Sequence, residues 1–296
     1  MKLCYCVATP DVIVMTDPSQ IKANVNPVWA LGTVALHGDI ERNFALLAEN
    51  GYDGVDLIVV EPDPKTGAGI RKLAEKYKLT VSCLNTGKVP AQTGLTLTDP
   101  DESVRKAAIV NSKQIIDFAH EVGEAGIAFG QIRGRYLDGV DRKLTYDYAV
   151  EAFRTLSDYA EPRNVMLTLE SINKRSMNFI NSIADGVEMV GAVGRDYFQM
   201  MMDTEHMHYE DDTIPTILKY GPKYLHQVHL SDTGRSCPGT GEIDFDAVIG
   251  AFRQAGYDGG FEVEFYQKPD PVICLKEAMD FLEPIFSKHY GWKKNS

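Results

Sequence analysis

In the stretch VMLTLE, residues 165–170, the kind of side chain depends on whether the position is odd or even. Val165, Leu167 and Leu169 at the odd positions are aliphatic, whereas Thr168 and Glu170 at even positions are polar. Alternation with a period of two is typical of a β-strand, because successive side chains of a strand point to opposite faces. The stretch therefore predicts a strand with one apolar and one polar face.

Similar short apolar runs recur along the whole chain, at residues 3–8, 54–60, 80–85, 126–132, 197–203, 225–230 and 260–265. Segments with helical periodicity, such as 40–50 and 99–122, lie between them. Because parallel strands need crossover helices, eight strand–helix units without a linker predict one α/β domain over residues 1–296, a single (β/α)8 TIM barrel. The long segment at about 9–39 is a candidate lid.

A doubly wound sheet split into two domains is the structural alternative. It is weakened because the first strand is not followed by a G-x-G-x-x-G dinucleotide motif, and because the chain has no G-x-x-x-x-G-K-[ST] phosphate loop.

The alternation of side chains along each strand, here called strand parity, places polar side chains inside the predicted barrel. In residues 261–265 (FEVEF) the apolar residues again alternate with acids, and the apolar face must meet the helices. The same parity applied to the last four strands gives each one an inward potential metal ligand near its C-terminal end: Glu170, Asp203, His229 and Glu264. Active sites of this fold lie at that end of the barrel. Glu262, one layer deeper, is expected to pair with a buried cation or polar group.

Convergence of these four side chains calls for a compensating cation, because an unpaired buried carboxylate costs several kcal/mol. Three carboxylates and an imidazole, with no thiolate, favour a divalent ion, with Mn²⁺ first and Mg²⁺ or Co²⁺ as alternatives. Taken singly, each acid could equally cap a helix or pair at the surface. Their coincidence on four successive strands favours the metal site.

Other residues near the predicted mouth have simpler interpretations. The acids just beyond Asp203 resemble a solvated helix start; they are Glu205, Glu210, Asp211 and Asp212. Trp29, in the candidate lid, is either a residue over the mouth or a packing anchor. Residues 238–241 (PGTG) with Arg235 could hold a phosphate, or form a tight loop; a free sugar or polyol derivative is the preferred substrate.

Composition excludes several classes of protein. The formal net charge of −12 would repel a nucleic acid, and no apolar run approaches the length of about 18 residues that a membrane span needs. The five cysteines form no C-x-x-C pair, so they are expected to be buried thiols. The start of the chain has no signal-like segment, which predicts a cytoplasmic protein.

Four segments resemble one family: LTLESINKRSMNFINS, MMDTEHMHYEDD, HQVHLSDTGRSCPGTGEIDF and GYDGGFEVEF. Over about residues 165–266 they are similar to the xylose isomerase-like sugar isomerases and epimerases, and most similar to the ketose 3-epimerases, the D-tagatose and D-psicose 3-epimerase group. Two positions depart from that group: Phe265-Tyr266 replaces Pro-Phe after Glu264, and Ser231-Asp232 replaces Gly-Glu after His229.

The resemblance implies a set of roles for the site residues. Glu170, Asp203, His229 and Glu264 would hold the metal, and His206 and Arg235 would contact the substrate. Glu170 and Glu264 would also exchange a proton with a ketose through an enediolate, giving 3-epimerisation of a small-molecule sugar. The resemblance also implies a homo-oligomer.

Other functions remain open at this stage. A keto-inositol dehydratase or a 1,2-keto/aldo isomerase would use the same metal and bases, and a non-enzymatic sugar-binding protein would leave the bases idle. A nuclease of the endonuclease IV type is disfavoured, because no D-x-H element follows His229 and the chain is acidic.

Overall fold

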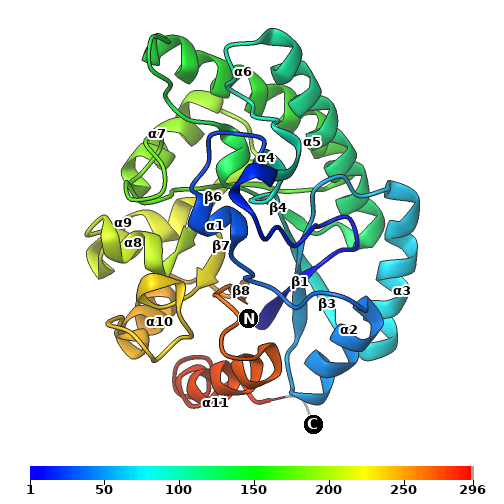
Figure 1. Ribbon diagram of the computed structural model, residues 1–296. Coiled ribbons are helices and arrows are strands. Elements are labelled where there is room, and N and C mark those ends of the chain that lie inside the picture. Colours follow the sequence, from blue (N-terminus) through cyan, green and yellow to red (C-terminus); the bar gives the residue numbers. More distant parts are fainter. Residues whose placement is uncertain (295–296) are drawn as a thin grey trace.

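The protein is described by a computed structural model that covers residues 1–294. Eight parallel strands form a closed barrel in chain order, and helices surround it (Figure 1). The strands are β1 (Lys2–Ala8), β2 (Gly54–Ile58), β3 (Thr80–Asn85), β4 (Gly126–Phe129), β5 (Leu167–Glu170), β6 (Phe198–Asp203), β7 (Leu225–Leu230) and β8 (Gly260–Val263). The predicted TIM barrel is confirmed.

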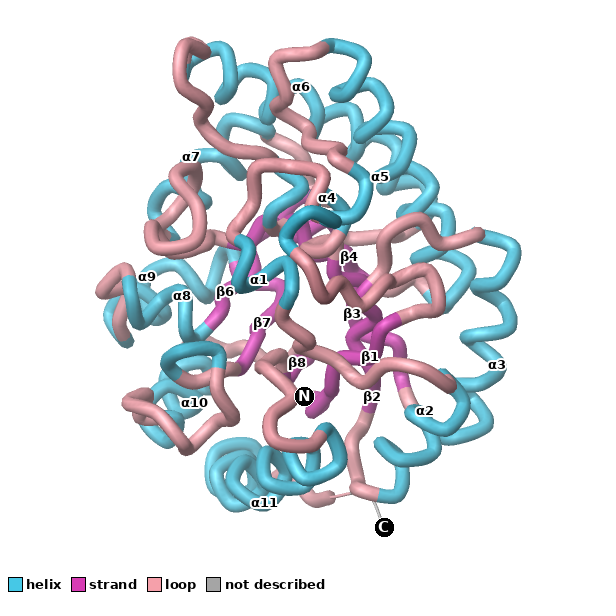
Figure 2. The backbone as a smooth tube through the Cα atoms, viewed as in Figure 1, coloured by secondary structure: helices cyan, strands magenta, loops and turns pink. Residues whose placement is uncertain are grey.

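Most of the helices form an outer layer around the strands, and the short α1 and α4 lie across the end of the barrel, as Figure 2 shows. They are α1 (Pro27–Leu31), α2 (Ile40–Glu49), α3 (Gly67–Tyr77), α4 (Val89–Thr93), α5 (Glu102–Gly123), α6 (Arg142–Ala160), α7 (Ile183–Val193), α8 (Thr204–Tyr209), α9 (Ile214–Tyr224), α10 (Phe245–Gln254) and α11 (Pro271–Tyr290). Among the described residues, no helix combines the length and apolarity needed to cross a membrane.

Strand boundaries agree with the alternation, with small differences at the ends. The runs at 80–85 and 225–230 coincide with β3 and β7. The run at 126–132 is a strand only to Phe129, because a short 3₁₀ helix, η3 (Gln131–Arg133), begins after Gly130. The last strand ends at Val263, but the Glu264 N–H still donates to the Leu230 carbonyl at 3.1 Å. Glu264 therefore stays at the strand end.

The predicted facing of the side chains is confirmed. Leu167 and Leu169 are fully buried in the apolar layer between strands and helices. On the opposite face of β5, the Thr168 hydroxyl donates to the Gln227 side chain of β7 at 3.1 Å, inside the barrel. Glu262 lies in the same inner layer and accepts from the Ser82 hydroxyl at 2.5 Å. The expectation that Glu262 pairs with a polar group is therefore correct.

The segment between β1 and α2 crosses the C-terminal end of the barrel, where Figure 1 shows α1 in front of the strands. The buried Lys88, just after β3, holds α1 in place. Its ammonium donates to the carbonyls of Trp29 at 2.5 Å and Gly32 at 2.7 Å, and lies 4.7 Å from the Trp29 ring centre. One lysine thus caps the last turn of α1 and fixes Trp29 over the mouth.

The five cysteines behave as the sequence predicts. All are free and buried. Burial raises the pKa of all five thiols, for example that of Cys4, so they are poor nucleophiles near neutral pH.

Candidate active site and metal centre

The last four strands bring the predicted ligands together. Glu170 and Asp203 are the final residues of β5 and β6, His229 is the penultimate residue of β7, and Glu264 follows β8. The strand register pairs Asp203 directly with His229. The exposed fraction of these side chains is 8% for Glu170 and at most 1% for the other three, so the cluster is almost fully dehydrated.

The donor atoms of this cluster fit a divalent cation. Ligand atoms of Asp203, His229 and Glu264 lie within 4.8 Å of one another, and so do those of Glu170, Asp203 and His206. The Nδ1 atom of His229 is buried and has no hydrogen-bond partner, and it lies 3.5 Å from Oε2 of Glu264. Its other nitrogen, Nε2, lies 3.2 Å from Asp56. Asp56 therefore holds the ring with Nδ1 facing the carboxylates, the orientation that a metal ligand requires.

Protonation of His229 competes with metal binding. Burial alone disfavours the imidazolium, but the contact with Asp56 and the surrounding carboxylates raise the pKa of His229 to about 9. The same excess of negative charge would favour a cation at Nδ1.

Arg235 joins the two sides of the cluster. Its guanidinium is buried and donates to Asp203 at 2.6 Å and to Glu264. Burial alone would lower the pKa of Arg235, but Asp203 and Glu205 raise it above its ordinary value, so the side chain is charged. The guanidinium also lies 5.2 Å from the Trp29 ring centre, beneath α1.

His206 is a neutral imidazole beside Glu170. It lies on α8, whose N-cap Asp203 accepts from the His206 backbone N–H at 3.0 Å. Burial lowers the pKa of His206 to about 3. The Asn173 amide lies 2.8 Å from Nδ1, which leaves Nε2 with the proton, 3.5 Å from Oε1 of Glu170. His206 can therefore donate a hydrogen bond into the site.

Glu170 occupies space that only a glycine opposite it provides. A Cβ atom on Gly130 would lie 2.3 Å from Oε2 of Glu170, so any larger residue would displace the carboxylate. Burial, and then the charge of Asp203, raise the pKa of Glu170. Glu264 differs: it accepts from the Asn85 amide at 2.7 Å and from Arg235. The charge next to each glutamate therefore differs: the negative Asp203 carboxylate acts on Glu170, whereas the positive Arg235 guanidinium pairs with Glu264.

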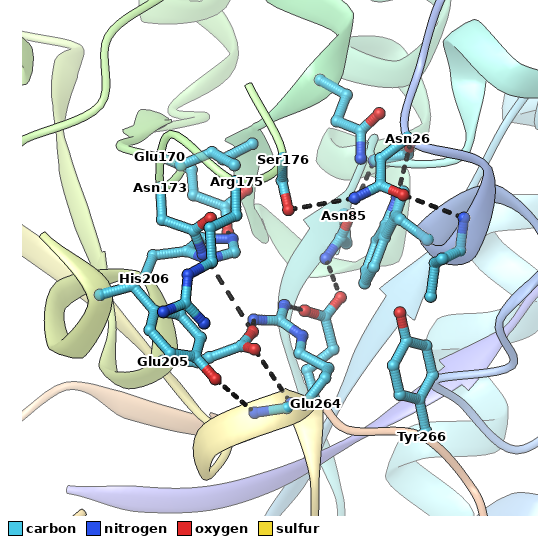
Figure 3. Close-up of a pocket in the computed structure, with 18 residues that line it drawn as sticks. Asn26, Asn85, Glu170, Asn173, Arg175, Ser176, Glu205, His206, Glu264 and Tyr266 are labelled. Carbon is cyan, nitrogen blue, oxygen red and sulfur yellow. Dashed lines mark hydrogen bonds and ion pairs between the residues drawn. The ribbon is translucent and has the colours of Figure 1, made fainter. Parts of the chain in front are cut away.

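A cavity of about 270 Å³ opens at this end of the barrel, lined by Glu170, Glu264, His206 and Arg235 among others. Figure 3 shows the labelled side chains around it, with Tyr266 on the side opposite His206. Trp29 also lines this cavity. Its alternative interpretations thus resolve in favour of a residue over the mouth. The space suits a small polar molecule.

The sequence missed several lining residues. Glu205 was interpreted as solvated, which is wrong: only 8% of it is exposed, and it accepts from the Arg235 backbone N–H at 3.0 Å. The reason is that the chain turns directly into α8 after Asp203, so that residue 205 faces the neighbouring strand loop. Asn85 could have been found by the rule used for the acids, because it is the polar last residue of β3. Asn173 lies in a loop and Gln131 begins the 3₁₀ helix η3, and strand parity gives no signal in either.

The loop after β7 encloses an acid of its own. The Asp232 carboxylate is fully buried and accepts from the backbone N–H groups of Gly239 at 3.0 Å, Gly241 at 2.8 Å and Ile243 at 3.1 Å. A phosphate bound in this loop would need the same backbone N–H groups as its hydrogen-bond donors. Residues 238–241 therefore form a tight loop around Asp232, the second of the two interpretations of this sequence.

Comparisons with known proteins agree with this architecture. A family model described as "Xylose isomerase-like TIM barrel" matches residues 44–285. L-ribulose 3-epimerase of Methylomonas sp. (strain DH-1) is 26% identical over 237 residues, covering 76% of this chain and 79% of the relative. Inosose isomerase of Bacillus velezensis is 28% identical over 276 residues, covering 87% of this chain and 96% of the relative.

Solved structures share the fold. A D-psicose 3-epimerase determined in the presence of D-fructose superposes with a TM-score of 0.77 at 19% identity, covering 99% of this chain and 100% of that one. A structure described as IOLI protein with a binding zinc atom superposes with a TM-score of 0.73 at 18% identity, and the match covers 99% of this chain and 100% of that one. With a family model that matches most of its length, the chain belongs to the xylose isomerase-like TIM barrel family.

Proposed function

We propose that this protein is a divalent metal-dependent sugar epimerase or isomerase, and that its reaction is the 3-epimerisation of a ketose. The observation that carries the proposal is the pair Glu170 and Glu264, which line one cavity from different strands beside a cluster fit for a cation. The relatives named as ketose 3-epimerase and inosose isomerase support the same reaction class.

The proposed metal ligands are Glu170, Asp203, His229 and Glu264. When bound, a divalent ion supplies Lewis-acid polarisation of a ketose carbonyl and its neighbouring hydroxyl. The Nδ1 atom of His229, buried without a hydrogen-bond partner, supports this assignment. Mn²⁺ is the proposed metal because the donors are oxygen and nitrogen.

The two glutamates are the proposed proton-transfer groups. One removes the proton from the sugar carbon, which gives an enediolate, and the other returns a proton to the opposite face, so the carbon is inverted. His206 donates a hydrogen bond from Nε2 to a substrate oxygen, and Arg235 stabilises the negative charge that develops on the enediolate. Trp29 and Tyr266 cover the cavity and limit access of water.

Proton NMR in D₂O tests the proposal. A panel of free ketoses, ketose phosphates and keto-inositols is incubated with the protein and Mn²⁺, and in parallel with EDTA. Deuterium at C3 of a ketose, only with metal, is the expected result. No exchange on any member, with metal verifiably bound, would contradict the proposal and favour a binding role.

A second candidate is an isomerase or dehydratase acting on a keto-inositol. The inosose isomerase relative, which matches 87% of this chain, favours it. Exchange confined to the keto-inositols in the same panel would identify this reaction, and exchange at C1 of a ketose would identify a 1,2-isomerase.

Two further proposals are a cytoplasmic location and a homo-oligomeric assembly, and the resemblance to the sugar epimerases supports the second. Sedimentation velocity of the purified protein tests the second: a single species with the mass of one 32.9 kDa chain would contradict it.

A further inference from the structure

A second cavity, of about 180 Å³, lies beside the first and is here called the side cavity. It is bounded by three segments, 22–25 of the lid, 94–99 after α4 and 131–137 after β4, and by Met177 of the loop after β5. Its volume is several times the share of one water molecule in the liquid, about 30 Å³, so it has room for a substituent of a substrate. Gln131 lines both cavities.

Gln131 is a polar side chain without a partner. Only 5% of it is exposed, and its buried Oε1 atom has no hydrogen-bond partner among the described residues, 1–294. It follows Gly130, the residue against which the Glu170 carboxylate lies. An unpaired buried amide costs free energy. Its position next to the proposed base makes a bound sugar hydroxyl a suitable partner.

The side cavity is more positive than the rest of this acidic protein. Lys22 and Arg135 line it, against one acid, Asp99. Arg135 donates to the Asn24 side chain at 3.1 Å and the Ser176 carbonyl at 3.0 Å, both neutral acceptors. Within the described residues, no carboxylate pairs with the Lys22 ammonium. Asp99, by contrast, already accepts an N–H from the turn that precedes α5.

A buried arginine adds to the positive potential at the side cavity. Arg133 is fully buried on η3 and donates only to backbone carbonyls, those of Gly130, Phe179 and Ile180. Its charge is therefore not cancelled by a direct ion pair. A charged group in a dehydrated surrounding acts over a longer range than one in water.

Gln131 lies between the two cavities, since it lines both. The Asn26 amide of the lid donates to the Ser176 hydroxyl of the loop after β5 at 3.3 Å, as Figure 3 shows, and both residues line the first cavity. A substrate that reaches from Glu170 past Gln131 would enter the side cavity.

We propose that the natural substrate carries an anionic group, a phosphate or a carboxylate, at the end remote from its reacting carbon, and that Lys22 and Arg135 bind this group in the side cavity. Gln131 holds a hydroxyl between the two ends. The proposal rests on the proposed sugar epimerase function and narrows its substrate class. The loop at 238–241 offers no competing anion site, because Asp232 fills it.

Binding of unreactive polyols tests the site without any turnover. Calorimetric titrations of the Mn²⁺-loaded protein compare sorbitol with sorbitol 6-phosphate and with gluconate. We expect at least one anion to bind about 10-fold more tightly than sorbitol, which is ~1.4 kcal/mol. Equal affinity of all three would overturn the proposal.

Variants show where the anion binds. We expect Lys22→Gln to lose part of the preference for the anion. The double variant, Lys22→Gln with Arg135→Gln, should lose more of it. Lys276→Gln, the same change at an exposed position of α11, should keep it. A preference that persists in the double variant would place the anion elsewhere, for example on the metal, and would overturn the proposal. Lys22→Gln breaks no hydrogen bond that the side chain makes, so it tests the site even if the double variant fails to fold.

The deuterium-exchange panel separates the two proposals. Exchange on free ketoses as fast as on their phosphates and acids would overturn the anion site and leave the epimerase function intact. Anion-selective binding lost in Lys22→Gln, with no exchange on any sugar, would keep the site and overturn the function.

Discussion

Asp56 determines which nitrogen of His229 faces the carboxylates. It is fully buried, and its contact at 3.2 Å with Nε2 fixes the ring at the bottom of the cluster. Carboxylate partners of this kind orient metal-bound histidines and make them better ligands. The strength of metal binding should therefore depend on a residue that does not touch the metal.

Asp56→Asn tests this dependence. The amide keeps the size of the side chain but removes its charge, so we expect Mn²⁺ affinity to fall by about 10- to 100-fold. Titration calorimetry measures it, and Asp280→Asn, at an exposed position on α11, is the matched control. The Gln227 amide also lies 3.3 Å from Nε2, so unchanged affinity would show that Asp56 is not the residue that orients His229.

Glu264 has two proposed tasks, metal ligation and proton transfer. In Glu264→Gln the amide can still accept from Asn85, so we expect the fold to be retained. Turnover should fall by at least the factor of about 10² to 10⁴ that one acid–base group contributes. Circular dichroism and the NMR exchange assay on the same sample measure both effects. Near-normal turnover would remove Glu264 from the mechanism.

At the scale of the elements, buried polar side chains fix two segments near the site. The Asp232 carboxylate holds its own loop after β7, and the Lys88 side chain, from the segment after β3, holds α1. Neither arrangement follows from strand parity, because the first lies within an irregular loop and the second joins segments far apart in the chain. The acids at the last strand ends were predictable because a barrel makes its strand ends converge, whereas Glu205, Asn173 and Gln131 were not, because their places depend on how loops fold back.

Asp232→Ala should loosen the loop at 237–243. Removal of the carboxylate leaves four backbone N–H groups without their acceptor, and hydrogen bonds to charged groups contribute about 1.5–3 kcal/mol each. We expect the free energy of unfolding to fall by at least ~2 kcal/mol in urea denaturation. Asp232→Asn, which keeps one acceptor oxygen, should lose less. Equal stability of both variants and the parent would contradict this account of the loop.

Lys88→Met should free α1 from the barrel. The thioether retains the volume of the stem but donates no hydrogen bond to the Trp29 and Gly32 carbonyls. Hydrogen exchange of residues 27–32 should become faster, while Lys65→Met, at an exposed position outside this contact, should leave it unchanged. Equal protection in both variants would show that other contacts hold α1.

At the scale of the whole molecule, the barrel explains why residues spread from 170 to 264 form one site. Parallel closure places all strand C-termini at one end, and β8 pairs with β1 to complete the ring. The sequence was enough to predict this closure, because eight alternating runs with helices between them allow few other arrangements. The side cavity lies outside that repeat, so only the structure located it.

The central claim is that four strand ends bind a single divalent ion between the two proposed bases. X-ray diffraction from crystals grown with Mn²⁺, with an anomalous difference map, tests it most directly. The account predicts one strong peak, within bonding distance of Glu170, Asp203, His229 Nδ1 and Glu264, with Arg235 still inside the cavity. A fully loaded protein whose only peak lies away from these four residues would contradict it.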